Sequence, residues 1–295
     1  MSNYFSEFPI VDYKFGNETT FTRFQHLGTM VDILDQVKKY EVYYRQYHIQ
    51  NGERPEQLSY KLYNNVNYYW TFYLLNDHIR QGGWPIRDAD VWPKAQEYYP
   101  NTVITTHGVT QQKSPRLFDD GNKVTIQWLP TETKTPLSQS EFVRPGNWVY
   151  FDYSKKVGKI LKVDQKMGMV WTDVKDIRGI DKVFDVIPED EVEIVIGSGG
   201  DYVPSTRYEE VQIHKVYDEF DAPHHYENAE GDWVWPEYSA TYPYPMDQRS
   251  VNSVNSVSYY QRLAETNETQ KSIAVIKGDV IERIASELSR LMKAY

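Results

Sequence analysis

The chain has 295 residues, with 42 acidic residues against 32 Lys and Arg, a formal net charge of -10 and no cysteine. Because it has no thiol, the sequence excludes disulfides, thiolate metal sites and a cysteine nucleophile. The acidic balance argues against a nucleic-acid scaffold, since phosphate binding depends on Lys and Arg. The 25 tyrosines favour protein interfaces and half-buried walls, although Tyr also replaces Phe and Leu in modest cores.

The first segment, residues 1–29, is rich in aromatic side chains and broken by one proline and two glycines. We expect an extended arm there rather than a helix. An arm this apolar does not stay disordered in water, so it packs on its own body or on a neighbour. Its candidate interface residues are Tyr4, Phe5, Phe8 and Tyr13. The arm lacks the features of a signal peptide, and no apolar run approaches the roughly 18 residues of a membrane span.

Residues 30–102 are predicted to hold a helix and a small α+β module. The helix follows Asp32, where apolar residues recur three and four apart. Residues 44–50 then alternate like a short strand, and Pro55 opens a helix after a Gly-containing turn. A second helix follows, with Asn76 and Asp77 at its end. A strand is expected to return near Trp84, which is also a candidate interface residue. The module residues of interest are Tyr47, Pro55, Leu58, Leu62, Tyr63, Trp70, Asn76 and Asp77.

Residues 103–212 form a β-rich segment of a different character. Five short runs are rich in β-branched and aromatic residues and are separated by Gly, Lys or Asp turns, at residues 147–152, 157–164, 167–173, 182–187 and 191–196. This pattern predicts a small SH3-like or OB-like barrel at about residues 141–197. The second and third runs are predicted to form a hairpin, and the glycine-rich stretch at residues 197–200 a linker.

The last third of the chain returns to the aromatic theme. Residues 213–257 combine Trp233 and Trp235 with several prolines, so we expect an extended wrap that is neither a helix nor a good central strand. Residues 258–295 are predicted to form a helix, a short apolar run and a capped amphipathic helix. The apolar stripe of this last helix includes Ile284, Leu288 and Met292, and it docks either on its own domain or on a partner.

The sequence contains no recognisable catalytic constellation. No pair among its seven histidines has the helical spacing of a zinc site, and there is no phosphate-binding glycine loop or nucleophile elbow. The best metal candidate runs from Asp218 to His225. However, adjacent histidines on a strand point to opposite faces, which favours a solvated acidic loop. We therefore predict no catalytic residue, no cofactor and no metal site.

Two resemblances rest on particular residues. The run from Tyr47 to Tyr63, followed by Tyr69-Trp70 and Leu75-Asn76-Asp77, resembles a LysM module. The order of four features resembles the baseplate wedge subunit of contractile-tailed bacteriophages, the gene-product-fifty-three type. These features are Tyr4-Phe5, Phe8-Pro9 and Tyr13 in the arm, Arg54-Pro55-Glu56 at the helix entry, Trp84-Pro85, and the ending from Lys271-Ser272-Ile273 to Met292-Lys293. The resemblance covers residues 1–99 and 211–295, and the β-rich segment departs from it.

The resemblance implies a fold and a function. The fold would be α+β: a LysM-like βααβ module with extended aromatic arms, an inserted small barrel and a C-terminal amphipathic helix. The function would be that of a non-enzymatic late structural protein of the virion tail baseplate, assembled in the host cytoplasm. Its partners would be other wedge proteins, hub or sheath-proximal proteins and copies of itself in a sixfold assembly, with no nucleic acid. Two alternatives are a LysM protein that binds N-acetylglucosamine chains of peptidoglycan and a cell-wall hydrolase with an accessory barrel.

Overall fold

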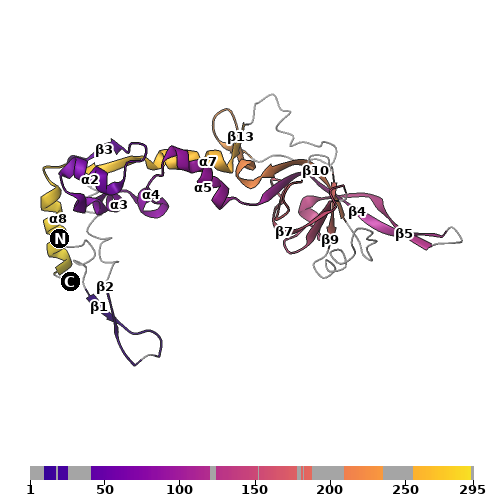
Figure 1. Ribbon diagram of the computed structural model, residues 1–295, viewed down its shortest axis with the longest axis horizontal. Helices are drawn as coiled ribbons and strands as arrows, with labels where there is room; N and C mark the ends of the chain where they lie inside the picture. Colours follow the sequence, from indigo (N-terminus) through magenta and orange to yellow (C-terminus); the bar gives the residue numbers. More distant parts are fainter. Residues whose placement is uncertain are drawn as a thin grey trace. The chain divides into compact units, whose positions relative to one another are not determined.

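The computed structural model describes residues 10–17, 19–25, 41–119, 124–151, 153–177, 181, 183–187, 209–234 and 255–293. The chain divides into two compact units, residues 1–91 with 264–295 and residues 92–263 (Figure 1). The first unit is thus built from both ends of the sequence. Helices and strands both contribute substantially, so the chain is α+β, as the sequence predicts.

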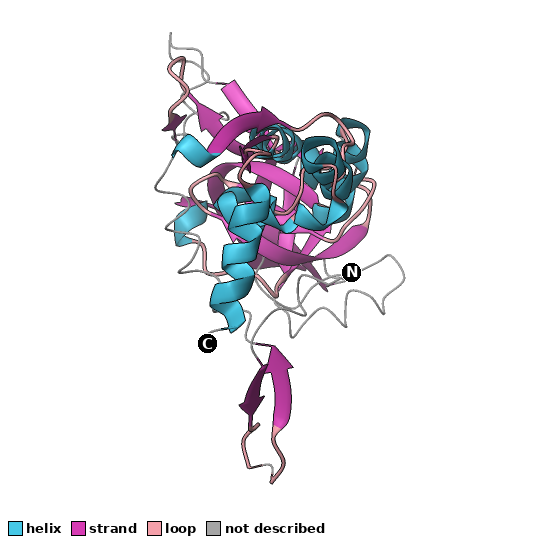
Figure 2. Cartoon of the chain, turned by 90° about the vertical axis from the view of Figure 1, so that its left-hand side faces the viewer, coloured by secondary structure: helices cyan, strands magenta, loops and turns pink. Residues whose placement is uncertain are grey.

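Unit 1 begins with a hairpin of two antiparallel strands, β1 (Ile10–Tyr13) and β2 (Thr22–Gln25), drawn in Figure 2. Its N-terminal part continues with η3 (Glu41–Tyr43), β3 (Tyr44–His48), α2 (Pro55–Tyr63), η4 (Val66–Tyr68), α3 (Trp70–Leu75), α4 (Asp77–Gly82) and the start of α5 (Asp88–Tyr98). Its C-terminal part holds the end of α7 (Tyr259–Gln270), β14 (Ser272–Ile276) and α8 (Ile281–Lys293). The helix expected after Asp32 lies outside the described residues.

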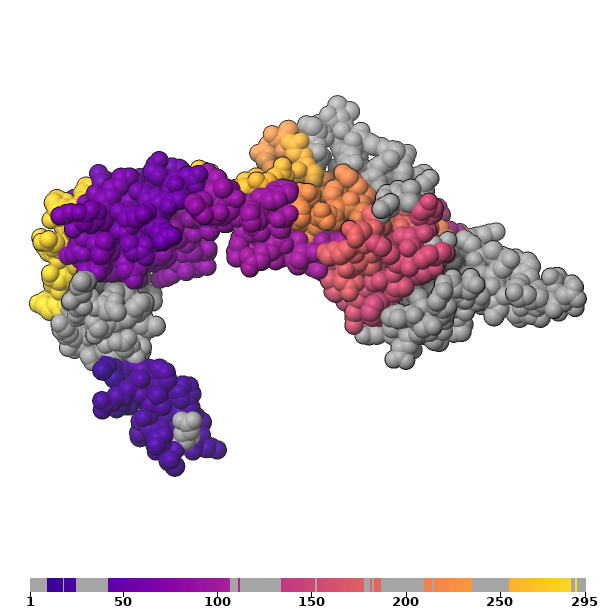
Figure 3. Space-filling view, in the orientation of Figure 1, coloured from indigo at the N-terminus to yellow at the C-terminus, as the bar shows by residue number. Residues whose placement is uncertain are grey.

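Besides the hairpin, unit 1 contains a second two-stranded sheet, which joins segments that are far apart in the sequence. β3 pairs antiparallel with β14, with Tyr47 opposite Ile273. The prediction of a returning strand near Trp84 is wrong, because α4 is followed there by irregular backbone and the turn leads into α5. The apolar run at residues 273–276 takes that place instead, and it buries Ile273 and Val275 completely. In Figure 3 the yellow C-terminal residues lie directly against the violet residues of the module.

The core of unit 1 is shared between its two chain segments. One cluster comprises Ile49, Leu58, Phe72, Ile79, Ile273 and Val275, and a second comprises Leu75, Ile276 and Ile281. The local signals in α2 are as expected. Pro55 is the first helical residue, where a missing N–H costs nothing, and Asn64 ends the helix at φ +54° with its N–H bonded to Tyr60 O.

Unit 2 contains a closed barrel of six strands. The seven-stranded sheet that forms it has the elements β4 (Thr102–Asp119), β5 (Val124–Pro136), η5 (Leu137–Gln139), β6 (Trp148–Phe151), β7 (Lys156–Asp164), β8 (Met169–Thr172), β9 (Val183–Ile187) and β10 (Glu209–Asp218), of which β5 pairs only with β4 and lies outside the ring. The sheet order is β10-β9-β6-β7-β8-β4-β5, and the additional pairing of β10 with β4 closes the ring. The predicted hairpin is present as β7 and β8. The barrel extends beyond the predicted residues 141–197, because β4 and β10 also belong to it. The run expected at residues 191–196 lies outside the described residues.

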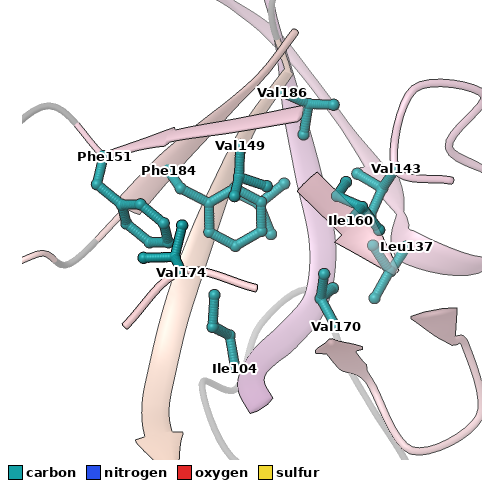
Figure 4. Packing of buried hydrophobic residues seen from close by; sticks show 11 residues of the cluster. Ile104, Leu137, Val143, Val149, Phe151, Ile160, Val170, Val174, Phe184 and Val186 are labelled. Carbon is teal, nitrogen blue, oxygen red and sulfur yellow. The ribbon is translucent and has the colours of Figure 1, made fainter. Parts of the chain in front are cut away.

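Alternating residues of the barrel strands fill its interior, as the period of two requires (Figure 4). Along β6, Val149 and Phe151 are fully buried, and along β9 the same holds for Phe184 and Val186. Gly158 on β7 is buried as well. A Cβ atom there would lie 1.8 Å from Val174 Cγ2, so the packing leaves room for glycine alone.

A three-stranded sheet follows the barrel in unit 2. Its elements are η7 (Glu219–Asp221), β11 (Pro223–Glu227), β12 (Trp233–Val234) and β13 (Asn255–Ser258), with the order β12-β11-β13. The prediction that residues 213–257 make a poor central strand is wrong for β11, which is the middle strand. Pro223 is tolerated because it is the first residue of that strand, where no ladder donor is needed. Residues 235–254 lie outside the described part of the chain.

Candidate interaction site

Asn76 connects the two chain segments of unit 1. Its side chain is almost completely buried between α3 and β14. Its Nδ2 donates hydrogen bonds to Phe72 O (2.8 Å) and Ala274 O (2.9 Å), and its Oδ1 accepts one from Ala274 N (2.8 Å). The amide therefore pairs with β14 as a neighbouring strand residue would. The Tyr63 hydroxyl donates to Ile276 O (2.9 Å), so side chains complete the outer edge of β14. Burial raises the pKa of Tyr63 to about 12.

A second amide makes a corresponding connection on α7. Asn267 is buried, its Nδ2 donates to Ile86 O (3.0 Å), and its Oδ1 accepts from Ile86 N (2.8 Å). Nearby, the buried Lys271 ammonium contacts Asp88 (2.8 Å) and Glu268 (2.6 Å). These hydrogen bonds raise the pKa of Lys271, the one to Asp88 most of all. Neither role could be predicted from the sequence, because Ile86 and Asp88 lie about 180 residues from Asn267 and Lys271.

Glu53 organises the turn between β3 and α2. Its carboxylate accepts hydrogen bonds from the Tyr47 hydroxyl (3.0 Å), from Lys61 Nζ (3.1 Å) and from Gln50 N (3.1 Å). Its backbone carbonyl accepts from Trp84 Nε1 (2.7 Å). Hydrogen bonds to Tyr47 and then to Glu53 raise the pKa of Lys61. The polar atoms that a sugar would need on Tyr47 and Trp84 are therefore already engaged within the module.

The structure brings most of the module residues chosen from the sequence together. Leu58 and Trp70 are buried, and Tyr47, Leu62 and Tyr63 are partly buried against the first core cluster. Trp84, chosen from the sequence as an interface candidate, is also partly buried against this cluster. Pro55 starts α2 and Asn76 bonds β14, as described above. Asp77 is different, because it is exposed at the start of α4 and pairs with Arg80 at 2.9 Å.

The interface residues chosen from the sequence are scattered over both units. Tyr13 is exposed on the hairpin and Trp233 is exposed on β12, whereas Ile284 is partly buried against the second core cluster. Figure 2 shows α8, which carries Ile284. Four of the remaining candidates, Tyr4, Phe5, Phe8 and Trp235, lie outside the described residues, and the side chains of Leu288 and Met292 are likewise not described. The exposed apolar residues of the module itself are Val42, Tyr43, Tyr60 and Val66.

The segment from Asp218 to His225 has a structural role in unit 2. Glu219 is buried and accepts hydrogen bonds from Trp171 Nε1 (2.9 Å) and Asn101 Nδ2 (2.8 Å). A register shift between Pro223 and His225 lets the two adjacent imidazoles approach, with their Nδ1 atoms 2.9 Å apart. His225 Nε2 lies 2.8 Å from Glu227. No group of three or more His, Cys, Asp or Glu residues with metal-binding geometry occurs in the described part of the chain.

The contacts described above for unit 1 define a structural module in which polar side chains form hydrogen bonds with the module's own backbone. Residues 20–102 match a family model described as base plate wedge protein 53. The resemblance predicted from the sequence is confirmed over this segment, which is less than half of the chain, and the match supports a structural role in a phage baseplate. No curated protein matches the chain's sequence. Among the described helices, none is long and apolar enough to cross a membrane.

Proposed function

We propose that the protein is a wedge subunit of a phage tail baseplate that binds neighbouring wedge and hub proteins and helps to join the wedges into a sixfold ring. The observation that carries this proposal is the family match at residues 20–102, which includes β3, α2, α3 and α4 of the module. The match ends where β4 begins, so its support for a baseplate role comes from residues 20–102.

The surface of the module supports a binding role. Its buried polar side chains are used internally, as Asn76 and Glu53 show. Several of its apolar side chains are exposed, among them Tyr60 at 58% and Val66 at 45%. A protein partner that covers these side chains would remove their apolar surface from water. Ile281, the first residue of α8, packs in the core of its own module. This favours docking of the first turn of α8 on its own chain rather than on a partner.

The proposal is tested in assembled particles. Tails purified from cells that make the Tyr60→Glu variant should contain much less of this chain than wild-type tails, because a carboxylate at an apolar interface is costly. Glu56→Gln changes another exposed side chain of α2 and is the matched control. Quantitative mass spectrometry of the tails gives the copy number. Absence of the wild-type chain from purified tails would refute the baseplate role.

A second candidate function is binding of N-acetylglucosamine chains by a LysM-like module. The observation that favours it is the arrangement β3, α2, α3 and β14, which supplies two strands and two helices in the βααβ pattern once β14 is included. The engagement of Tyr47 and Trp84 by Glu53 counts against an open sugar site. Retention of the full chain on purified peptidoglycan, lost in Tyr47→Ala, would support this function, and no retention would exclude it. No described arrangement of residues favours the hydrolase.

A further inference from the structure

The β1–β2 hairpin has two chemically different faces. Successive residues of a strand point to opposite sides, and Val11 lies opposite Phe24 in the register. Val11, Tyr13 and Phe24 therefore share one face, and the Phe15 ring extends it, 5.0 Å from Tyr13 and 5.4 Å from Phe24 between ring centroids. The other face carries an ion pair.

That ion pair joins Asp12 and Arg23, which face each other across the strands, with 3.4 Å between Arg23 Nε and Asp12 Oδ1. Both side chains are more than half exposed, so the pair adds little stability. The aromatic face itself carries no charged side chain. It therefore offers no cationic group to anionic lipid or nucleic acid, and a protein surface is the partner that fits.

The aromatic face is open to solvent. Val11, Tyr13, Phe15 and Phe24 are 39%, 55%, 48% and 43% exposed. An isolated two-stranded hairpin is at best marginally stable in water, and this one has no buried side chain among its described residues to stabilise it. Its ordered form is therefore expected to depend on contacts made by the aromatic face.

We propose that this aromatic face docks in an apolar cleft of a different baseplate protein. The proposal rests on the proposed function. The area of the face decides whether a second copy of this chain or a different protein is the partner. Four side chains that are about half exposed present roughly 350 Å², since an aromatic side chain buries about 150–250 Å². Two such faces packed together would bury about 700 Å², the size of a crystal contact rather than of a stable dimer.

A cleft provides the missing area because it also encloses the rim of the hairpin. Ile10 on the polar face and Phe21 beside β2 are 66% and 67% exposed, and enclosing them brings the buried area closer to the roughly 800 Å² per partner of a specific interface. The cleft would have an apolar floor for the rings of Phe15 and Phe24. Its rim would carry polar groups to pair with the Tyr13 hydroxyl.

The first test uses a photoreactive benzophenone side chain in place of Phe15 in the full chain, incorporated into tails. The matched control places the same group at Thr20, which is also exposed in the turn of the hairpin. Irradiation of purified tails should cross-link position 15 to a protein of different sequence, at least fivefold more than position 20. A cross-link to another copy of this chain, a cross-link within the chain or an equal yield at both positions would overturn the proposal.

The second test uses substitutions on the two faces. Phe24→Glu should lower incorporation into tails at least tenfold, whereas Arg23→Gln on the opposite face should lower it less than twofold. Hydrogen exchange of β14 and of the barrel, unchanged in both variants, shows that the rest of the chain is folded. Equal incorporation of the two variants would refute the docking face. If the wild-type chain is missing from tails, the proposed function fails. If it is present and position 15 gives no cross-link, this inference alone fails.

Discussion

The two units are closed by different means. In unit 2, a long ladder between β10 and β4, with two register shifts, completes the barrel, so backbone pairing is spread over many residues. In unit 1, the sheet of β3 and β14 has only two strands, and the outer edge of β14 is completed by the side chains of Asn76 and Tyr63. The difference teaches that unit 1 depends on a few side chains and on a strand far away in the sequence, whereas unit 2 is closed by backbone pairing.

The largest predicted effect comes from removing the C-terminal segment. A chain that ends at Leu263 lacks Ile273, Val275 and Ile276, which are buried in the core of unit 1. Loss of each such side chain costs about 2–5 kcal/mol, and the sum approaches the total stability of a domain, about 5–15 kcal/mol. We expect residues 41–91 to unfold and the barrel to remain folded.

Hydrogen exchange of the truncated chain measures this difference directly. Amides of α2 and α3 should exchange at the rate of an unfolded chain, whereas amides of β6 and β9 should stay protected. Protection of α2 and α3 without β14 would contradict the view that unit 1 is completed by the C-terminal segment. Loss of protection in both units would show that the units depend on each other.

The next largest effect is expected from Asn76→Ala. The substitution leaves the N–H and C=O of Ala274 buried without the partner that they have now. An unsatisfied buried polar group costs about 1–3 kcal/mol, so we expect a loss of about 2–4 kcal/mol in the unfolding free energy of unit 1. Denaturant unfolding, followed by exchange of the β14 amides, gives the value. Asn67→Ala alters an exposed amide in η4 and should change the free energy by less than about 0.5 kcal/mol.

Local signals in the sequence were sufficient for the elements that neighbouring residues determine. Pro55 marked the start of α2, and the β-branched and aromatic residues of the runs 147–152 and 182–187 predicted β6 and β9. The pairing of β3 with β14 could not be predicted in this way. Its partners are more than 220 residues apart in the chain, and no local pattern states which strand an apolar run will join. A strand was predicted near Trp84, but the backbone there is irregular, and the Trp84 ring packs against the first core cluster.

The site was predictable to the same limited extent. Asn76 was chosen because an amide follows the second helix, but its pairing with Ala274 depends on a strand from the other end of the chain. The argument that adjacent histidines diverge fails for His224 and His225, because a register shift in β11 turns the two rings together. Such irregularities depend on the partner strand β13, and the histidine segment alone does not reveal them.

A smaller effect is expected in unit 2, from Gly158→Ala in the barrel. The added Cβ would meet Val174 Cγ2 at 1.8 Å and Thr172 Oγ1 at 2.8 Å, and overpacking of this kind costs about 1–3 kcal/mol. Because the barrel is held by many backbone bonds, it should stay folded with a lower melting temperature. Gly278→Ala in unit 1 is the matched control, since its Cβ would lie 3.5 Å from the Leu62 carbonyl. If both substitutions lower the melting temperature equally, packing at Gly158 is not the cause.

The smallest effect concerns the pH dependence of the three-stranded sheet in unit 2. Burial lowers the pKa of His224 below its ordinary value of 6.5, and the neighbouring His225, Arg262 and Lys162 lower it further. The unfolded chain therefore binds a proton near pH 6.5, before the folded chain does. Stability from this group is present above that pH and is lost as the pH falls below it. Amides of β11 and β13 should exchange faster at pH 5 than at pH 7, relative to amides of β6.

The same measurement on His224→Gln separates this group from the rest of the cluster. Glu227, Arg262 and Lys162 stay in place in that variant, so any pH dependence that they cause alone would persist. We expect the difference between pH 5 and pH 7 to shrink, because the variant lacks the side chain whose pKa burial lowers. An unchanged pH response would mean that His224 is not the responsible group. Faster exchange of the β6 amides at pH 5 as well would mean that the barrel and the three-stranded sheet open together. The pairing of β10 with β4 would then not keep the barrel closed independently of that sheet.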